Sequence, residues 1–278
     1  MDDHETDQAT GLRALAGAGA GADTSVRLPA LTVTGGKGGV GKTSIAVNLA
    51  LLLRRMSLEP LLVDCDLGLA NADVLLGISP RTTLYEVMRD GAPLDRAVVT
   101  DPRGLALAPA ASGRDELTRL PRHEFQRLLR ELGRVADGYD LLVLDTSAGI
   151  HSEVTGFVRA ARLALIVITP DPTSLTDAYA LIKVTLARRR DAAFAVVVNQ
   201  ASGAQEAQIC FQRLRKVVRT YLDHDLEYLG HLPADRNVRE AVRARVPFVT
   251  REEAPATRAL KAIALRLKRM RWKTVTGG

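Results

Sequence analysis

The sequence predicts an α/β fold with a doubly wound, mostly parallel sheet that carries helices on both faces. Short β-branched or Leu-rich runs alternate along the chain with helical patterns, which is typical of βαβ units with right-handed crossovers. Several runs, such as Leu141 to Leu144, are apolar at every position, as expected for strands that helices cover on both faces. The first run leads directly into a glycine-rich segment that opens a helical pattern.

Each predicted strand is a short apolar run bounded by polar or turn-forming residues. The strands are predicted at 30–34, 60–64, 104–108, 140–145, 163–169, 193–198 and 227–232. Each predicted helix is a segment in which apolar residues recur with a period of 3.6. The helices are predicted at 43–56, 82–90, 122–137, 152–161, 174–189, 204–222, 236–244 and 255–272.

The chain of 278 residues is long enough for one large α/β domain. We divide it into a flexible N-terminal arm at 1–29, a main domain at 30–254, and a basic amphipathic helix and tail at 255–278. The Ala/Gly stretch within the arm is typical of linkers. No apolar run approaches the roughly 18 residues that span a bilayer, and the acidic N-terminus lacks the apolar region of a signal peptide.

The two cysteines, Cys65 and Cys210, form no metal-binding or redox motif, so we expect a reduced, cytoplasmic protein. The formal net charge is +6, but residues 254–278 carry seven basic and no acidic side chains, which leaves −1 for the rest. A nearly neutral body argues against a general nucleic-acid-binding surface, and we expect no specific nucleic-acid partner.

Residues 35–43 read Gly-Gly-Lys-Gly-Gly-Val-Gly-Lys-Thr and match the phosphate-loop pattern GxxxxGK[ST]. Glycines let successive backbone N–H groups turn inward as an anion cradle, and the following helix adds its positive N-terminal end. Lys42 can reach the β- and γ-phosphates, and the Thr43 hydroxyl can bind Mg²⁺. The nucleotide-binding residues predicted here are Gly36, Lys37, Gly38, Gly39, Val40, Gly41, Lys42, Thr43 and Ser44.

The second lysine of this loop, Lys37, has no role in an ordinary phosphate loop. The segment resembles the deviant Walker A motif of the MinD/ParA ATPase family, KGGxxGK[ST]. The resemblance implies a P-loop NTPase fold, ATP or ADP as the nucleotide, and an ATP-bound homodimer. It also implies that Lys37 crosses the dimer interface and neutralises charge on the phosphoryl group that is transferred. The alternative is an ordinary solvated lysine.

Carboxylates follow two of the predicted strands, where ligands bind in open α/β sheets. The segment from Asp64 to Asn71 resembles the family's switch I, DxDxGxxN. This implies that Asp66 orients the attacking water near the γ-phosphate and that Asn71 supports it. By themselves, Asp64 could cap the strand end and Asp66 could be a turn residue.

The run Leu141 to Leu144 ends in Asp145, which is typical of a Walker B carboxylate, and the following residues match the family's DTxAG switch II. We therefore predict that Thr43, Asp66 and Asp145 serve Mg²⁺. In the family, the position of Asn199 contacts the adenine base, and the loop with Pro233 and Asp235 resembles a second base-contacting segment. Asn199 and Asp235 could also be simple turn residues.

Two further segments resemble the flagellar branch of this family, the ATPases called FlhG, FleN or YlxH. Residues 169–180 are similar to TPEPTSxTDAY, with Asp171 in place of Glu, and residues 7–13 are similar to DQAxxLR. The second motif implies that Gln8 stimulates a flagellar signal-recognition-type GTPase, FlhF, when the arm folds on it. The alternatives are a helix cap after a strand end for 169–180 and an uninformative tail for 7–13.

The C-terminal helical pattern places Leu260, Ile263, Leu267 and Met270 on one face, with basic side chains opposite. The resemblance implies that this helix associates with an anionic membrane surface. The protein would then associate peripherally with the inner face of the cell membrane, and the cell pole is one place where this could occur. The alternative is a last helix that packs on the sheet and keeps a solvated basic face.

Together these features predict an ATP-hydrolysing, ATP-dimerised switch that regulates flagellar number or placement. The resemblance implies contacts with flagellar switch (C-ring) proteins or with a flagellar transcription regulator. A division-site MinD protein is one alternative, although it would lack the DQA arm. A ParA-type DNA-partition ATPase is another, against which the nearly neutral body argues.

Overall fold

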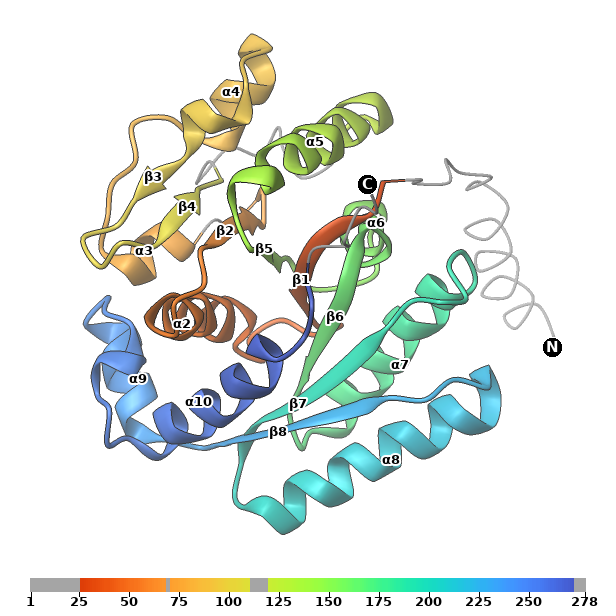
Figure 1. Cartoon of the computed structure of the whole chain (residues 1–278). Helices are drawn as coiled ribbons and strands as arrows, with labels where there is room; N and C mark the ends of the chain where they lie inside the picture. The colour runs from red at the N-terminus through yellow and green to blue at the C-terminus, as the bar shows by residue number, and fades with distance from the viewer. Residues whose placement is uncertain (1–25, 69–70, 111–119, 273–278) are drawn as a thin grey trace, which may run out of the picture.

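A mostly parallel sheet of eight strands forms the centre of the molecule (Figure 1). The computed structural model describes residues 26–68, 71–110 and 120–272. Within these ranges the strand order is β3-β4-β2-β5-β1-β6-β7-β8, and all neighbours pair in parallel except β3 with β4. The predicted doubly wound α/β class is therefore confirmed.

The strands coincide closely with the apolar runs of the sequence. They are β1 (Leu28–Thr34), β2 (Pro60–Cys65), β3 (Val99–Thr100), β4 (Ala106–Ala108), β5 (Leu141–Thr146), β6 (Ala161–Ile168), β7 (Phe194–Ala201) and β8 (Glu227–Pro233). The sequence analysis does not predict the antiparallel edge strand β3, because two residues are too few to show an alternation.

The helices also follow the predicted segments. They are α2 (Lys42–Arg55), α3 (Ala72–Leu76), α4 (Leu84–Asp90), α5 (Arg122–Val135), α6 (Ser152–Ala160), α7 (Pro172–Leu186), α8 (Ala204–Leu222), α9 (Arg236–Arg243) and α10 (Pro255–Lys268). Short 3₁₀ helices occur at η1 (Leu94–Ala97), η3 (Ala136–Gly138) and η4 (Phe248–Thr250). The five-residue helix α3 is not predicted, since it is barely longer than one helical turn.

The two faces of the sheet carry separate hydrophobic clusters. In β1, Leu31 and Val33 belong to the cluster that includes α2 and α10, whereas Leu28 and Ala30 belong to the cluster with α4, α5 and α6. A third cluster joins β6 and β7 to α7 and α8. Helices therefore cover both faces, and the carboxyl ends of the central strands are left at one edge of the sheet.

The last helix, α10, is part of this core. Leu260, Ile263 and Leu267 are buried against α2 and β8, and Met270 packs at the margin of the same cluster. The apolar face that the sequence analysis assigned to a membrane thus faces the protein interior, and the alternative of a packed last helix describes this structure. Because it packs on α2 and β8, the helix shares a hydrophobic core with the main domain at 30–254.

Replacing Leu267 by Ala is expected to lower the free energy of unfolding by about 2–5 kcal/mol, because a buried leucine leaves a cavity when it is truncated. Leu267 is fully buried, whereas Leu265 on the same helix is 45% exposed. Leu265→Ala is therefore the matched control and should cost much less. Urea denaturation of both variants measures the difference, and equal losses would show that α10 is not docked in solution.

Candidate functional site

The glycine-rich loop joins β1 to α2 at the carboxyl edge of the sheet. Gly39 and Gly41 have φ angles of 76° and 93°, which glycine adopts without strain. A Cβ at Gly36 would lie 2.4 Å from the backbone of Asp177 in α7, so no larger residue fits there. Because Gly41 is the N-cap of α2, the positive end of this helix opens onto the loop. This backbone can bind phosphate.

The ammonium of Lys42 lies inside this loop. The residue is 8% exposed, and its Nζ donates a hydrogen bond to the carbonyl of Lys37 at 3.1 Å. Burial lowers the pKa of Lys42, while the charges of Asp145 and Asp66 act in the opposite direction and favour the charged form. The structure therefore brings the predicted lysine and both predicted carboxylates into one electrostatic group.

Asp145 is fully buried, and neither of its carboxylate oxygens accepts a hydrogen bond from the described part of the chain. Burial, and then the charge of Asp64, raise the pKa of Asp145 well above its usual range, whereas Thr43 and Lys42 lower it. The Ser44 hydroxyl is likewise buried and without a partner among the described residues. Buried polar atoms of this kind are costly unless a cation or water meets them.

These groups fit Mg²⁺, which takes one or two carboxylates together with phosphate and water oxygens. Asp145 and the Thr43 hydroxyl are suitable donors, and the adjacent loop supplies the place for phosphates. In the described ranges, no group of three or more His, Cys, Asp or Glu side chains could hold a metal ion together.

Asp64 organises the loop that carries Asp66 and Asn71. Its Oδ1 accepts the N–H of Asp66 at 3.0 Å, and its Oδ2 accepts the N–H groups of Asn71 and Ala72, both at 3.1 Å. Burial raises the pKa of Asp64 to about 7 although these three bonds oppose the shift. Asp64 lies opposite Asp145 in the β2–β5 register. The strand-end cap that we considered for Asp64 is thus its structural role.

The two predicted catalytic residues of this loop, Asp66 and Asn71, lie in different environments. Asp66 is half-buried and acts on the pKa of Lys42, so it belongs to the phosphate end of the site. Asn71 is exposed and is the N-cap residue of α3. The structure brings Asp66 into the site, and the supporting role of Asn71 stays a prediction.

Lys37 forms an ion pair within its own chain. Its Nζ is 2.6 Å from Asp171 Oδ2 and 2.7 Å from Thr173 Oγ1, at the N-terminus of α7. The bond from Lys37, and then those from Thr173, lower the pKa of Asp171 to about 2. Asp171 Oδ1 also accepts the N–H of Thr173 at 2.8 Å and so caps the helix. Lys37 therefore has a partner in cis, and its predicted crossing to a second subunit stays a prediction.

The two predicted base-contacting positions are engaged in internal bonds. Asn199 Nδ2 donates to the Val40 carbonyl at 2.7 Å, which ties the end of β7 to the glycine-rich loop. Asn199 Oδ1 accepts the N–H of Gln200 at 2.9 Å. The adenine contact of Asn199 stays a prediction, to which the structure adds a role in holding the loop.

Asp235 caps two helices. It is the N-cap of α9, where Oδ1 accepts the N–H of Asn237 at 2.8 Å, and its Oδ2 accepts the N–H of Ala256 in α10 at 3.0 Å. Burial would raise the pKa of Asp235, but these backbone bonds outweigh it and lower the pKa. Both oxygens are thus in use, which favours the turn and cap alternative for the carboxylate. Pro233, at the end of β8, stays a predicted base contact.

Two residues with clear roles in this site were not predicted as such: Thr173 and Asp177. Both lie more than 130 residues from the loop they contact, and no local pattern signals that proximity. Gln8 and the rest of 1–25 lie outside the described residues.

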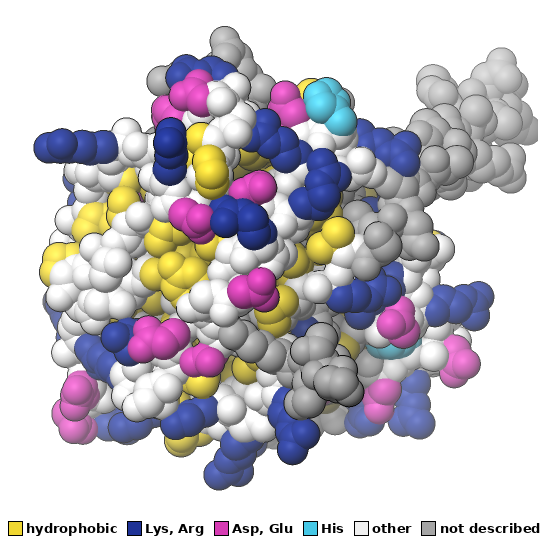
Figure 2. Space-filling view, turned by 45° about the horizontal axis from the view of Figure 1, so that its top comes forward, with side chains coloured by type: hydrophobic (Ala, Val, Ile, Leu, Met, Phe, Trp, Pro, Cys, Tyr) yellow, Lys and Arg dark blue, Asp and Glu magenta, His cyan; other side chains and the backbone are white. Residues whose placement is uncertain are grey.

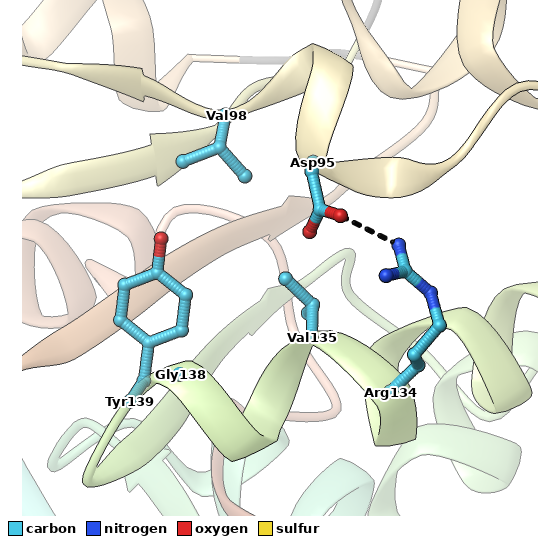
Figure 3. Close-up of a pocket in the computed structure, with 6 residues that line it drawn as sticks. All are labelled: Asp95, Val98, Arg134, Val135, Gly138 and Tyr139. Carbon is cyan, nitrogen blue, oxygen red and sulfur yellow. Dashed lines mark hydrogen bonds and ion pairs between the residues drawn. The ribbon is translucent and has the colours of Figure 1, made fainter.

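A separate cavity of about 480 Å³ lies at the opposite end of β5 from Asp145 (Figure 3). It is lined by Asp95, Val98, Arg134, Val135, Gly138 and Tyr139. Arg134 Nη2 donates to Asp95 Oδ2 at 2.8 Å, so the two charges at its mouth neutralise each other. The sequence motifs do not extend to this cavity.

The face in Figure 2 carries Lys and Arg side chains interspersed with Asp and Glu, so both signs of charge are present on it. In the ranges that the structure describes, no helix is long and apolar enough to cross a membrane.

Comparisons with known proteins agree with this geometry. Residues 31–248 match the family model described as the CobQ/CobB/MinD/ParA nucleotide binding domain. The chain is 42% identical over 235 residues to the antiactivator FleN of Pseudomonas aeruginosa, covering 84% of each protein. It is 33% identical over 217 residues to the flagellum site-determining protein YlxH of Helicobacter pylori, covering 77% of this chain and 73% of that protein.

Among solved structures, the septum site-determining protein MinD of Pyrococcus horikoshii, complexed with Mg-ADP, superposes with a TM-score of 0.72. At 22% identity, with 88% of this chain and 96% of that chain covered, this likeness shows the shared fold. The family match covers most of the chain and includes the loop, the two switch carboxylates and the strands that hold them. This chain therefore belongs to the CobQ/CobB/MinD/ParA nucleotide-binding family and is an ATPase of the MinD/ParA type.

Proposed function

We propose that this ATPase is an ATP-dimerised switch that regulates the number or placement of flagella. The likeness to FleN and YlxH, which extends over most of each protein, supports the flagellar role. The observation that carries the switch is the position of Lys37. Its side chain is 37% exposed at the rim of the phosphate loop and is held by one ion pair to Asp171, itself 42% exposed. An exposed pair of this kind is weak and readily exchanged.

In this proposal, the loop N–H groups and Lys42 bind the phosphates of ATP or ADP. Thr43, Asp145 and Asp66 serve Mg²⁺, which when bound neutralises phosphate charge. Asp66, supported by Asn71, also fixes the attacking water, while Asn199 and Pro233 contact the base. Lys37 leaves Asp171 and reaches the nucleotide of a second copy, so that dimerisation adds a positive charge where negative charge develops. The output of slow turnover is then a change between monomer and dimer.

We expect Asp171→Asn to shift ATP-dependent dimerisation to lower protein concentration, by about two- to fivefold, the range set by one exposed ion pair. Asn keeps an oxygen for the Thr173 N–H and so retains the cap, but it loses the charge that holds Lys37. Light scattering after size-exclusion chromatography in ATP measures the shift. Asp191→Asn, which removes another exposed carboxylate from an arginine pair, is the control. An unchanged midpoint in Asp171→Asn would show that the cis pair does not oppose dimerisation.

We also propose that the arm acts on a flagellar signal-recognition-type GTPase, FlhF, through Gln8. The motif Asp7 to Arg13 supports this step. A peptide of residues 1–20 is expected to stimulate GTP hydrolysis by that GTPase, and a Gln8→Ala peptide is expected to lose most of the stimulation. Phosphate release under multiple turnover is the measurement. If both peptides stimulate equally, Gln8 is not the activating residue, and if neither does, the flagellar partner is wrong.

Membrane association at the inner face of the cell membrane is the last part of the proposal. While α10 is docked, the exposed basic side chains of Lys261 in α10 and of Arg269 directly after it are available to anionic lipid. Contact through Leu260, Ile263 and Leu267 requires α10 to leave α2 and β8. Sedimentation with vesicles that contain phosphatidylglycerol, with ADP and with ATP, tests this. Binding that needs ATP and is lost in Leu267→Ala would indicate release, and salt-sensitive binding without ATP would indicate the docked basic face.

A further inference from the structure

Two threonines of β1 differ in their hydrogen bonding. Thr32 and Thr34 are both fully buried, and side chains two residues apart in a strand point to the same face of the sheet. The Thr32 hydroxyl donates to the carbonyl of Phe157 in α6 at 3.3 Å. The Thr34 hydroxyl has no hydrogen-bond partner among the residues that the structure describes. A buried hydroxyl without a partner costs free energy that a valine of nearly the same shape avoids.

The Thr34 side chain points away from the predicted Mg²⁺ donors. Val33, the preceding residue, lies opposite Asp145 in the β1–β5 register and belongs to the hydrophobic cluster that includes α2. Because side chains alternate along a strand, Thr34 points to the other face. There it lies opposite Ile166 of β6, whose cluster includes residues of α6 and α7. A partner for this hydroxyl is therefore expected on the α6 side of the sheet and not among the phosphate and Mg²⁺ ligands.

The segment on that side is the predicted switch II, residues 147–151, which joins β5 to α6. Thr34 is two residues closer than Thr32 to the carboxyl end of β1, a rise of about 7 Å. Since α6 runs back between two parallel strands, about four helical residues cover the same distance. Thr32 bonds to Phe157, so Thr34 is level with the first turn of α6, which begins at Ser152. The unused hydroxyl is thus next to the end of switch II.

Switch II is loosely held in this structure. The Gly149 N–H donates to the carbonyl of Gly35, the residue after Thr34, over a long distance of 3.4 Å. Gly149 has a φ angle of 105°, which glycine adopts without strain, and the next side chain, Ile150, is 46% exposed. None of residues 147–151 is fully buried. A segment with few buried contacts can change its conformation at low cost.

We propose that Thr34 positions switch II for ATP hydrolysis. When ATP is bound, the Thr34 hydroxyl forms a hydrogen bond with the backbone of residues 147–151 and holds their N–H groups toward the γ-phosphate, where negative charge develops. Thr34 acts through this segment and does not touch the nucleotide, so it is a positioning residue. The inference rests on the ATP-driven switch proposed above and adds the group that holds switch II in its ATP-bound form.

Replacing Thr34 by Val tests this in the full-length protein. The kcat for ATP is expected to fall about three- to tenfold, the rate equivalent of one hydrogen bond lost in the transition state. The KM should stay within about twofold of the wild type. The urea midpoint of unfolding without nucleotide should be unchanged or higher, because the variant removes a hydroxyl that has no partner in that state. Phosphate release against ATP concentration gives kcat and KM separately.

Two further variants separate positioning from packing. Thr34→Ser keeps the hydroxyl but loses a buried methyl group, so it should lower the urea midpoint and retain turnover. Thr32→Val is the matched control on the same face, because the Thr32 hydroxyl already bonds to Phe157. It should lower the midpoint and leave turnover within about twofold of the wild type. Stability and activity are therefore expected to change in opposite order across the three variants.

Hydrogen exchange of residues 147–155 measures the switch itself. With Mg²⁺ and a non-hydrolysable ATP analogue, exchange in the wild type should be slower than with ADP, and Thr34→Val should lose most of this protection. Wild-type turnover, a lowered urea midpoint or full protection in Thr34→Val would overturn the inference. A KM that rises as kcat falls would place the hydroxyl at the nucleotide and would also overturn it. If the wild type gains no protection with the analogue, the proposed ATP-driven switch itself is wrong.

Discussion

The variant Lys42→Ala is expected to lose about three orders of magnitude in ATP affinity, because it removes a buried charge that contacts the phosphates. Lys42 is 8% exposed at the base of the loop, and its Nζ already bonds to the Lys37 carbonyl, so its position is fixed before nucleotide binds. The same change removes the positive charge that favours the ionised form of Asp145. Phosphate and Mg²⁺ binding should therefore both weaken.

Isothermal titration with ATP and Mg²⁺ measures this loss. Lys37→Ala is the matched control, since Lys37 belongs to the same loop but points to Asp171 at the rim. Lys37→Ala should bind ATP nearly as well as the wild type and should fail in dimerisation. An affinity of Lys42→Ala within threefold of the wild type would mean that the loop does not hold the phosphates in the expected way.

The variant Asp66→Ala is expected to lower ATP turnover by about 10²- to 10⁴-fold, the range for a group that positions the proton acceptor or nucleophile, while ATP affinity changes little. Asp66 is half-buried on the loop that Asp64 fixes through its bond to the Asp66 N–H, and it acts on Lys42. Since Asp64 holds the backbone of this loop, removing the Asp66 side chain leaves the loop in place.

Turnover is measured by phosphate release and affinity by titration, so the two effects separate. Asp73→Ala is a control for surface charge, because Asp73 lies in the first turn of α3 just beyond the same loop. It should leave turnover within about twofold of the wild type, as expected for a partly exposed position outside the site. Turnover by Asp66→Ala at the wild-type rate would remove Asp66 from the catalytic machinery, and a parallel loss of affinity would assign it to nucleotide binding.

Much of the site was predictable because its chemistry is local in the sequence. The loop from Gly35 to Thr43 needs glycine where φ is positive and lysine and threonine at fixed offsets, so a short segment specifies its geometry. The carboxylates Asp66 and Asp145 follow apolar runs, and parallel strands bring such positions to one edge of the sheet. The fold class follows from the same alternation.

Other parts were decided by contacts between distant segments. Asp171 is 134 residues from Lys37, and only the packing of α7 against Gly36 brings them together. From the sequence, the carboxylate of Asp235 is a possible base contact. In the structure, α10 places the Ala256 N–H beside it, and the two form a hydrogen bond. Asn199 is similar, because its bond to Val40 exists only where β7 ends next to the loop.

The sequence by itself determined the order of the longer helices and strands, the phosphate loop and the positions of Asp66 and Asp145 after apolar runs, since these depend on periodicity and on short spacings. Only the tertiary structure decided which partner each polar side chain takes and which surface each helix buries. The apolar face of α10 could be buried in a membrane or in a protein core. In the structure it packs against α2 and β8 and so becomes part of the core. The physical reason is that the hydrophobic effect does not select a particular partner for an apolar surface. The geometry of the assembled sheet does select one, because it fixes which surfaces meet.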